Sequence, residues 1–163
     1  MRAGTSGAAE LTYTNVPSAT NYGTELEYGF KLDIFSHSDS NVFLSNSTVF
    51  TNLALIRSLV NVGELNGIKD RPLQGQSPFL VNAGYTFAYP RQDWTCSISY
   101  NIVGRRIYIA GNVQEPDVWE KGRNVVDFQF SKGLGKKFNV RINIRDVLAE
   151  QRLFYQNVGS SDK

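Results

Sequence analysis

The chain has 163 residues, which by the usual relation between length and domain number is about one domain. Seventeen Lys and Arg against 15 Asp and Glu give a net charge of +2, which is too balanced to indicate a nucleic-acid binder. One cysteine, Cys96, and one histidine, His37, exclude an internal disulfide and metal sites built from several cysteines or two histidines. No apolar run reaches the about 18 residues of a membrane helix, but a transmembrane β-strand needs only about 10 residues of alternating polarity.

The dominant pattern is an alternation with a period of two, which predicts strands with one apolar and one polar face. In the first clear strand, expected over 24–35, Leu26 and Phe30 lie on the apolar side and Glu25 and Glu27 on the polar side. Residues 10–15 are interpreted as the end of an earlier strand. The later strands are expected at 42–56, 78–89, 94–110, 123–132 and 138–145, which makes about seven in all.

The connections between these strands differ in length. His37–Asn41, Pro90–Asp93 and Gly133–Lys137 are short and rich in residues that form turns. The connections at roughly 57–77 and roughly 104–123 are longer. Short turns at one end and long loops at the other are typical of an antiparallel up-and-down meander, and of outer-membrane barrels in particular.

Alternation alone does not distinguish a soluble sandwich, whose apolar face forms a core, from a membrane barrel, whose apolar face contacts lipid. Aromatic residues at strand ends favour the barrel, because their rings suit a membrane interface; Tyr89 and Trp94 flank the Pro90–Asp93 turn in this way. Long charged side chains within strands, such as Arg141, suit a wet lumen. A soluble all-β ligand-binding module, with the two long loops as its ligand surface, remains the alternative.

Five segments, which cover nearly the whole chain in the same order, resemble barrel segments of TonB-dependent outer-membrane receptors. They are Arg71–Tyr85, Ser99–Ile107, Arg123–Lys132, Asn143–Leu148 and the pair Tyr13–Asn15 with Tyr22–Glu27. The resemblance implies an all-β fold, an antiparallel up-and-down meander that is a partial transmembrane β-barrel of the Gram-negative cell outer membrane. It also implies a function in nutrient uptake, gated by a plug that TonB energises.

The sequence shows no plug domain, no TonB-contacting segment and no signal sequence, and it stops before the closing strand expected of the family. We therefore expect residues 1–163 to be a single barrel segment, a fragment or truncated product of a receptor. Its expected partners are outer-membrane lipid, the plug and remaining barrel strands of the receptor, and a nutrient ligand. TonB is expected to act only through parts that this sequence lacks. A small self-contained outer-membrane barrel is the alternative within the same class.

The candidate ligand-binding residues are cationic or aromatic and are expected in the lumen or the outer loops: Arg105, Arg106, Trp119, Arg141 and Arg145. The arginines could bind an anionic ligand or lipopolysaccharide, and the tryptophan could stack on a sugar ring. The competing interpretations are ion pairs with acidic residues of neighbouring strands for the arginines, and loop packing or interface anchoring for the tryptophan.

No pattern in the sequence indicates an enzyme. Glu25 and Glu27 share a strand face, as paired catalytic carboxylates do, but nothing else in the sequence builds a sugar cleft. Lys132–Lys137 contains two glycines but lacks the Gly-Lys-Ser/Thr ending of a phosphate-binding loop. His37 stands among turn formers. We therefore predict a membrane transport component with no catalytic residues, no metal and no cofactor.

Overall fold

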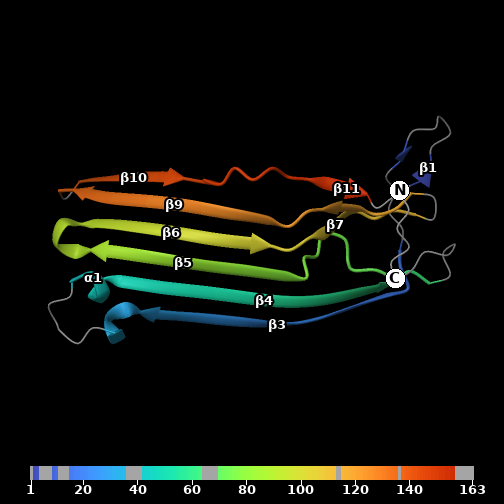
Figure 1. The fold of residues 1–163 in the computed structure, drawn as a ribbon, viewed down its shortest axis with the longest axis horizontal. Coiled ribbons are helices and arrows are strands. Elements are labelled where there is room, and N and C mark those ends of the chain that lie inside the picture. Colours follow the sequence, from blue (N-terminus) through green and yellow to red (C-terminus); the bar gives the residue numbers. More distant parts are fainter. Residues whose placement is uncertain are drawn as a thin grey trace.

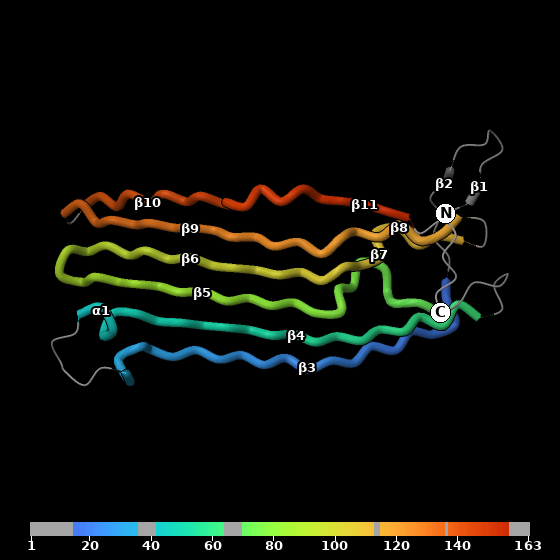
Figure 2. Tube along the Cα trace, viewed as in Figure 1, coloured from blue at the N-terminus to red at the C-terminus, as the bar shows by residue number. Residues whose placement is uncertain are grey.

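The computed structural model describes residues 2–3, 9–10, 15–35, 42–63, 70–112, 115–135 and 137–156. Its main body is a six-stranded antiparallel sheet in the order β10-β9-β6-β5-β4-β3 (Figures 1 and 2). The strands are β3 (Ser18–Lys31), β4 (Ser47–Asn61), β5 (Phe79–Tyr89), β6 (Trp94–Val103), β9 (Arg123–Leu134) and β10 (Phe138–Ile144). Each long strand pairs with the long strand that precedes it in the chain, which confirms the predicted meander.

The remaining elements are short. Three strands form a separate sheet at the loop end, on the right in Figure 1: β7 (Arg106–Ile109), β8 (Val118–Glu120) and β11 (Phe154–Gln156). Two further strands, β1 (Arg2–Ala3) and β2 (Ala9–Glu10), pair with each other. The helical turns are η1 (Leu32–Phe35), α1 (Val42–Ser45) and η2 (Pro90–Gln92). Within the described residues, no helix has the length and apolar character needed to span a membrane.

The predicted strand limits were wrong at several ends. The strand expected over 24–35 begins earlier, at Ser18, and stops at Lys31, because the chain turns into η1. The strand expected over 42–56 starts only at Ser47, after α1, and continues to Asn61. Both turns lie next to the His37–Asn41 connection, which is outside the described residues.

The strand expected over 94–110 is two strands, because the chain leaves the main sheet at Gly104. The Gly104 amide donates a hydrogen bond to the Phe79 carbonyl, and the Ser77 hydroxyl donates one to the Gly104 carbonyl, at 3.1 Å each. A Cβ on Gly104 would lie 2.8 Å from the Phe79 ring, so only glycine fits at this break. Of the strand end expected at 10–15, residues 11–14 lie outside the described residues, and Glu10 belongs to β2, which pairs with β1.

Residues directly opposite each other in an antiparallel pair project from the same face, so the register decides how each face is composed. One row across all six strands is wholly apolar: Phe30, Val49, Tyr85, Ile98, Phe128 and Ile144. The adjoining row, one residue along each strand, is wholly polar: Lys31, Thr48, Thr86, Ser97, Gln129 and Asn143. At these rows one face of the sheet is therefore apolar and the other polar, although Phe50 and Leu80 lie on the same side as the polar row.

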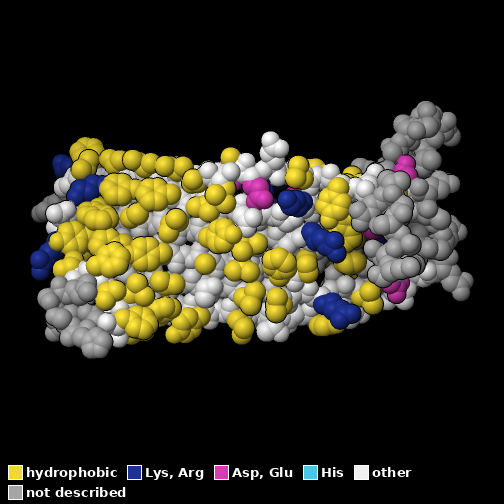
Figure 3. All heavy atoms as spheres, viewed as in Figure 1, with side chains coloured by type: hydrophobic (Ala, Val, Ile, Leu, Met, Phe, Trp, Pro, Cys, Tyr) yellow, Lys and Arg dark blue, Asp and Glu magenta, His cyan; other side chains and the backbone are white. Residues whose placement is uncertain are grey.

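The apolar face is open. Leu26 and Tyr28 are 63% and 61% exposed, and among the described hydrophobic residues only Val60, Val62 and Ile107 are buried. Figure 3 shows hydrophobic side chains gathered over one face of the six-stranded sheet, with lysines and arginines toward its two ends. No second sheet within the described residues packs against this face, as the core of a soluble sandwich would require.

Aromatic rings are in contact at the short-turn end of the sheet, as the sequence predicts for that end. The Phe87 ring centroid lies 5.3 Å from that of Phe43 on α1 and 5.2 Å from that of Trp94. The Trp94 ring in turn lies 6.1 Å from that of Phe130. These contacts link α1 and three strands into one aromatic border of the apolar face.

Gly23 and Gly29 both lie on the polar side of β3, but only Gly23 is in close contact with the backbone of β4. A Cβ on Gly23 would lie 2.5 Å from the Leu55 carbonyl oxygen, whereas a Cβ on Gly29 would meet nothing closer than 3.8 Å. Gly23→Ala is therefore expected to separate β3 from β4 and cost about 1–3 kcal/mol of stability. Gly29→Ala is the matched control. Urea-dependent unfolding of both variants in detergent micelles measures the difference, and equal stability of the two would contradict the close approach.

Candidate functional site

Side-chain hydrogen bonds cross the polar face of the sheet from strand to strand. The Asn52 side-chain amide donates to Glu25 on β3 at 2.5 Å and accepts a hydrogen bond from Asn82 on β5 at 3.3 Å. Closer to the short turns, Thr86 and Ser97 share a hydrogen bond of 3.0 Å. This face thus carries polar side chains that are hydrogen-bonded to one another, as polar groups removed from water need to be.

The formal charges on this face differ between its two edges. Glu25 and Glu27 are exposed on β3, at one edge of the sheet. Arg141, within β10 and opposite Ser131, and Arg145, directly after β10, are exposed at the other edge. Neither arginine forms an ion pair within the described residues. Arg141 projects from the polar side, and both candidate cations are exposed.

The three other candidate residues lie together at the loop end: Arg106 on β7, Trp119 on β8, and Arg105 directly before β7. Arg106 on β7 pairs with Glu120 on β8 at 2.8 Å, as the competing interpretation expects. The Arg105 guanidinium lies 5.2 Å from the centre of the Trp119 ring, which is within the range of a cation–π contact. Arg106 thus links β7 to β8 through its ion pair, and the Arg105 guanidinium packs over the Trp119 ring.

The two long loops are joined to each other by contacts that the sequence did not predict. Arg71, in the β4–β5 connection, binds the Asp117 carboxylate at 2.6 Å and the Gly111 carbonyl at 3.1 Å. The Gly75 amide donates to the Ile107 carbonyl at 2.8 Å, and Ile107 is completely buried. The sequence held no signal for the pairing of Arg71 with Asp117, because the partners stand 46 positions apart in irregular segments.

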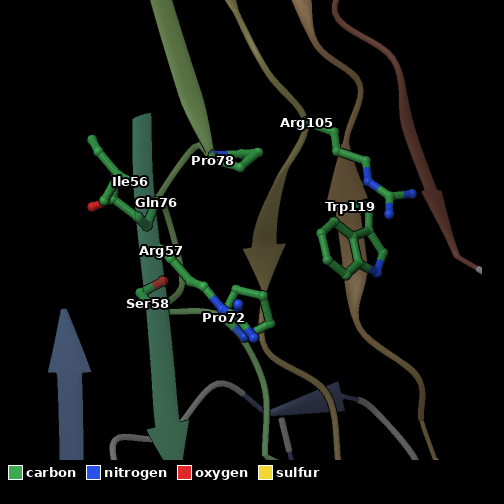
Figure 4. Close-up of a pocket in the computed structure, with 8 residues that line it drawn as sticks. All are labelled: Ile56, Arg57, Ser58, Pro72, Gln76, Pro78, Arg105 and Trp119. Carbon is green, nitrogen blue, oxygen red and sulfur yellow. The ribbon is translucent and has the colours of Figure 1, made fainter. Parts of the chain in front are cut away.

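A cavity of about 200 Å³ opens where these loops meet β4 (Figure 4). Its lining combines cationic, aromatic and proline side chains: Ile56, Arg57, Ser58, Pro72, Gln76, Pro78, Arg105 and Trp119. Sequence reasoning named Arg105 and Trp119 but missed Arg57. The signal for Arg57 was present, since it interrupts the apolar series Leu53, Leu55 and Leu59 on β4.

Within the described residues, no group of three or more His, Cys, Asp and Glu side chains is arranged to hold a metal ion. Cys96 projects from the apolar face between Phe87 and Phe130 and is half-buried. His37 lies outside the described residues.

The chain between β10 and β11 is fastened to the start of β9. The backbone and side-chain amides of Asn124 donate to the Glu150 carboxylate at 2.7 and 3.1 Å. Three residues farther along β9, the Asp127 carboxylate accepts a hydrogen bond from the Asp146 amide at 2.8 Å. The backbone hydrogen bond from Asn124 lowers the pKa of Glu150, and the Asn124 side-chain hydrogen bond lowers it further.

A lowered pKa in the folded protein means that the contact is present above the ordinary glutamate range and is lost as the pH falls through the folded pKa. Glu150→Ala is expected to detach the chain at residue 150 from β9 and speed amide exchange of Asn124 at neutral pH, whereas Glu150→Gln keeps an acceptor oxygen and the protection. In the native chain this protection should persist through pH 4.5, the ordinary glutamate value. Hydrogen exchange read by mass spectrometry measures both effects; an unprotected Asn124 amide at neutral pH would refute the tether.

Comparison with known families is consistent with the open, two-faced sheet. The family described as TonB dependent receptor-like, beta-barrel, matches residues 2–147, which contain all six long strands. No curated protein and no solved structure matches the chain. The family is one of Gram-negative outer-membrane receptors and transporters and not of enzymes, and the all-β sheet, unclosed between β3 and β10, is a partial barrel of that kind. The chain belongs to the β-barrel family of TonB-dependent outer-membrane receptors.

Proposed function

We propose that this chain forms part of the wall of a TonB-dependent transporter and that its polar side and long loops guide a bulky nutrient across the outer membrane. The observation that supports this most directly is the pair of adjoining rows, one wholly apolar and one wholly polar, across all six strands. Contact with lipid requires a wholly apolar row, and a water-filled lumen that holds a plug requires a polar row.

Arg141 and Arg145 are assigned to the lumen, where they contact the ligand or acidic groups of the plug. The proposal rests on their exposure and on their place on the polar side of the sheet. Residues 1–163 act as one barrel segment in this proposal, and the plug and the TonB contact are assigned to other parts of the receptor.

The loop end is assigned to ligand capture outside the cell. Ion pairs between Arg71 and Asp117 and between Arg106 and Glu120 join the two long loops and the short sheet into one body. Loops held in this way present a preformed surface, which lowers the entropy cost of binding a ligand. Arg106 therefore serves the ligand surface through Glu120 rather than by direct contact.

The direction of the apolar face can be tested with two adjacent residues of β6. Ile98 projects from the apolar face, and Ser99, beside it, projects from the polar face opposite Asp127. Ile98→Arg is expected to cost about 2–4 kcal/mol in a lipid bilayer, whereas Ser99→Arg should cost less than about 1 kcal/mol. Urea titration of refolding into vesicles gives both values. A larger cost for Ser99→Arg would reverse the assignment of the two faces.

Transport itself can be tested in cells that lack the receptor. Receptor that contains this segment should restore growth on at least one bulky nutrient, supplied singly as ferric chelates or oligosaccharides, and a protonophore should abolish the uptake. Replacing Arg141 and Arg145 by Glu should reduce that uptake, while Asn139→Asp, on the same side of β10, should change it little. Uptake that is unaffected by the protonophore would exclude energised transport.

A further inference from the structure

Two aromatic rings lie exposed and in contact on the short sheet at the loop end. The ring centroid of Tyr108 on β7 is 4.6 Å from that of Phe154 on β11. The two residues are 50% and 46% exposed. This pair, called the aromatic platform below, is an apolar surface that a ligand can cover, and exposed aromatic side chains often dominate the free energy of binding.

The register explains why both rings project from one face of the short sheet. Phe154 is directly opposite Glu120 on β8, and Glu120 is directly opposite Arg106 on β7, so these three side chains share a face. Tyr108 follows Arg106 by two positions and returns to the same face. A register shift after Ile107 leaves Tyr108 without a direct partner on β8. Because β8 lies between β7 and β11, the two rings meet above β8.

Hydrogen bonds fix the backbone on both sides of the aromatic platform. The Gln74 side-chain amide donates to the Tyr108 carbonyl at 2.9 Å. The Lys121 amide donates at 2.9 Å to the carbonyl of Leu153, the residue before Phe154. A surface that is held in place before binding loses little entropy when a ligand arrives. The platform is therefore preorganised.

The polar groups beside the aromatic platform neutralise each other. Arg106 and Glu120, on the same face as Phe154, form an ion pair at 2.8 Å, and Glu120 is only 8% exposed. An anionic ligand would gain little from a cation that is already paired. The surface therefore favours a neutral ligand that has apolar faces and polar edges.

The aromatic platform faces away from lipid. Trp119 is directly opposite both Ile107 and Tyr155, so it projects from the other face of the short sheet. Trp119 lines the cavity together with Arg57, which projects from the apolar side of β4. Anchoring at the membrane interface accounts for aromatic side chains on the lipid side of a barrel, but it does not account for rings on the opposite side.

We propose that the aromatic platform binds a neutral oligosaccharide, with the C–H faces of two linked sugar rings stacked on Tyr108 and Phe154. The two aromatic rings are tilted by 47°, so a rigid flat ligand such as a haem covers only one of them. A chain of sugar rings turns between its members and covers both. The electron-rich faces of the aromatic rings attract the C–H groups. The inference rests on the proposed uptake, and it names the class of nutrient.

Isothermal titration calorimetry of the purified receptor, in a detergent without a sugar head group, tests this with maltohexaose, cellohexaose, xylohexaose and mannohexaose. At least one of these should bind the native receptor. Phe154→Leu keeps an apolar side chain but loses the ring, so it should weaken that binding at least about tenfold. Tyr108→Leu should act in the same direction, and it tests the site even if the first variant does not fold.

Two variants serve as controls. Phe154→Tyr keeps the ring and should bind nearly as tightly as the native receptor. Leu153→Ala should also leave binding unchanged, because Leu153 is 47% exposed and adjacent to Phe154 but is not part of the ring pair. Haemin is the flat probe, and Phe154→Leu should not change its affinity for the receptor.

Three results would each overturn the proposal: no binding of any of the four hexasaccharides, full binding by both Leu variants, or loss of binding in Leu153→Ala. Binding is measured without an energy source, so it does not depend on whether a protonophore abolishes uptake. Energised uptake of a ferric chelate by a receptor that binds no hexasaccharide would refute the platform alone. Ring-dependent binding without energised uptake would refute the transport function alone.

Discussion

The structure depends on one constraint: inside a bilayer, every backbone amide and carbonyl of a strand must find its partner on a neighbouring strand, because lipid offers none. Six long strands satisfy this by continuous pairing, each with its predecessor among the long strands. Such pairing fixes the register, and a slip of one residue would exchange the row that contains Ile98 with the row that contains Ser97. The composition of both faces is therefore a direct result of backbone pairing. By the same constraint, the outer edges of β3 and β10 require further strands of a barrel beside them in the membrane.

The constraint does not apply at the loop end, where water can form hydrogen bonds with the backbone amides and carbonyls. The chain there is irregular. β6 stops at Val103, and the pairing between β4 and β5 ends at Leu55. Beyond these points the chain forms the short strands β7, β8 and β11. Stability in this region comes from specific polar contacts, such as Arg71 with Asp117 and the two hydrogen bonds of Glu150. Binding surfaces form where backbone pairing no longer dictates the position of each side chain, so the cavity lies at this border and not within the regular sheet.

Much of the regular sheet could be predicted from the sequence, because alternation and turn residues act between close neighbours. The strands around Phe128 and Ile142 and their shared apolar face follow from that pattern. The start of the long connection at roughly 104 was predicted, but the contact that requires glycine there could not be, since it involves the Phe79 ring of another strand. The same limit applies to the candidate site. Arg105 and Trp119 were recognisable as residue types, but their contact, and the cavity they share with Arg57, depend on strands that meet only in the fold.

The arginines show most clearly what the register adds to residue type. In the sequence, Arg57, Arg105, Arg106 and Arg141 are equivalent cations close to strands. The fold separates them into four environments: Arg106 against the carboxylate of Glu120, Arg105 over the Trp119 ring, Arg141 on the polar side, and Arg57 beside Leu55 and Tyr22 on the apolar side. A paired cation mainly links two parts of the chain, whereas an unpaired cation remains available to an anionic partner. The surroundings of each charge thus follow from the face of the sheet and the position along the strand at which backbone pairing places it.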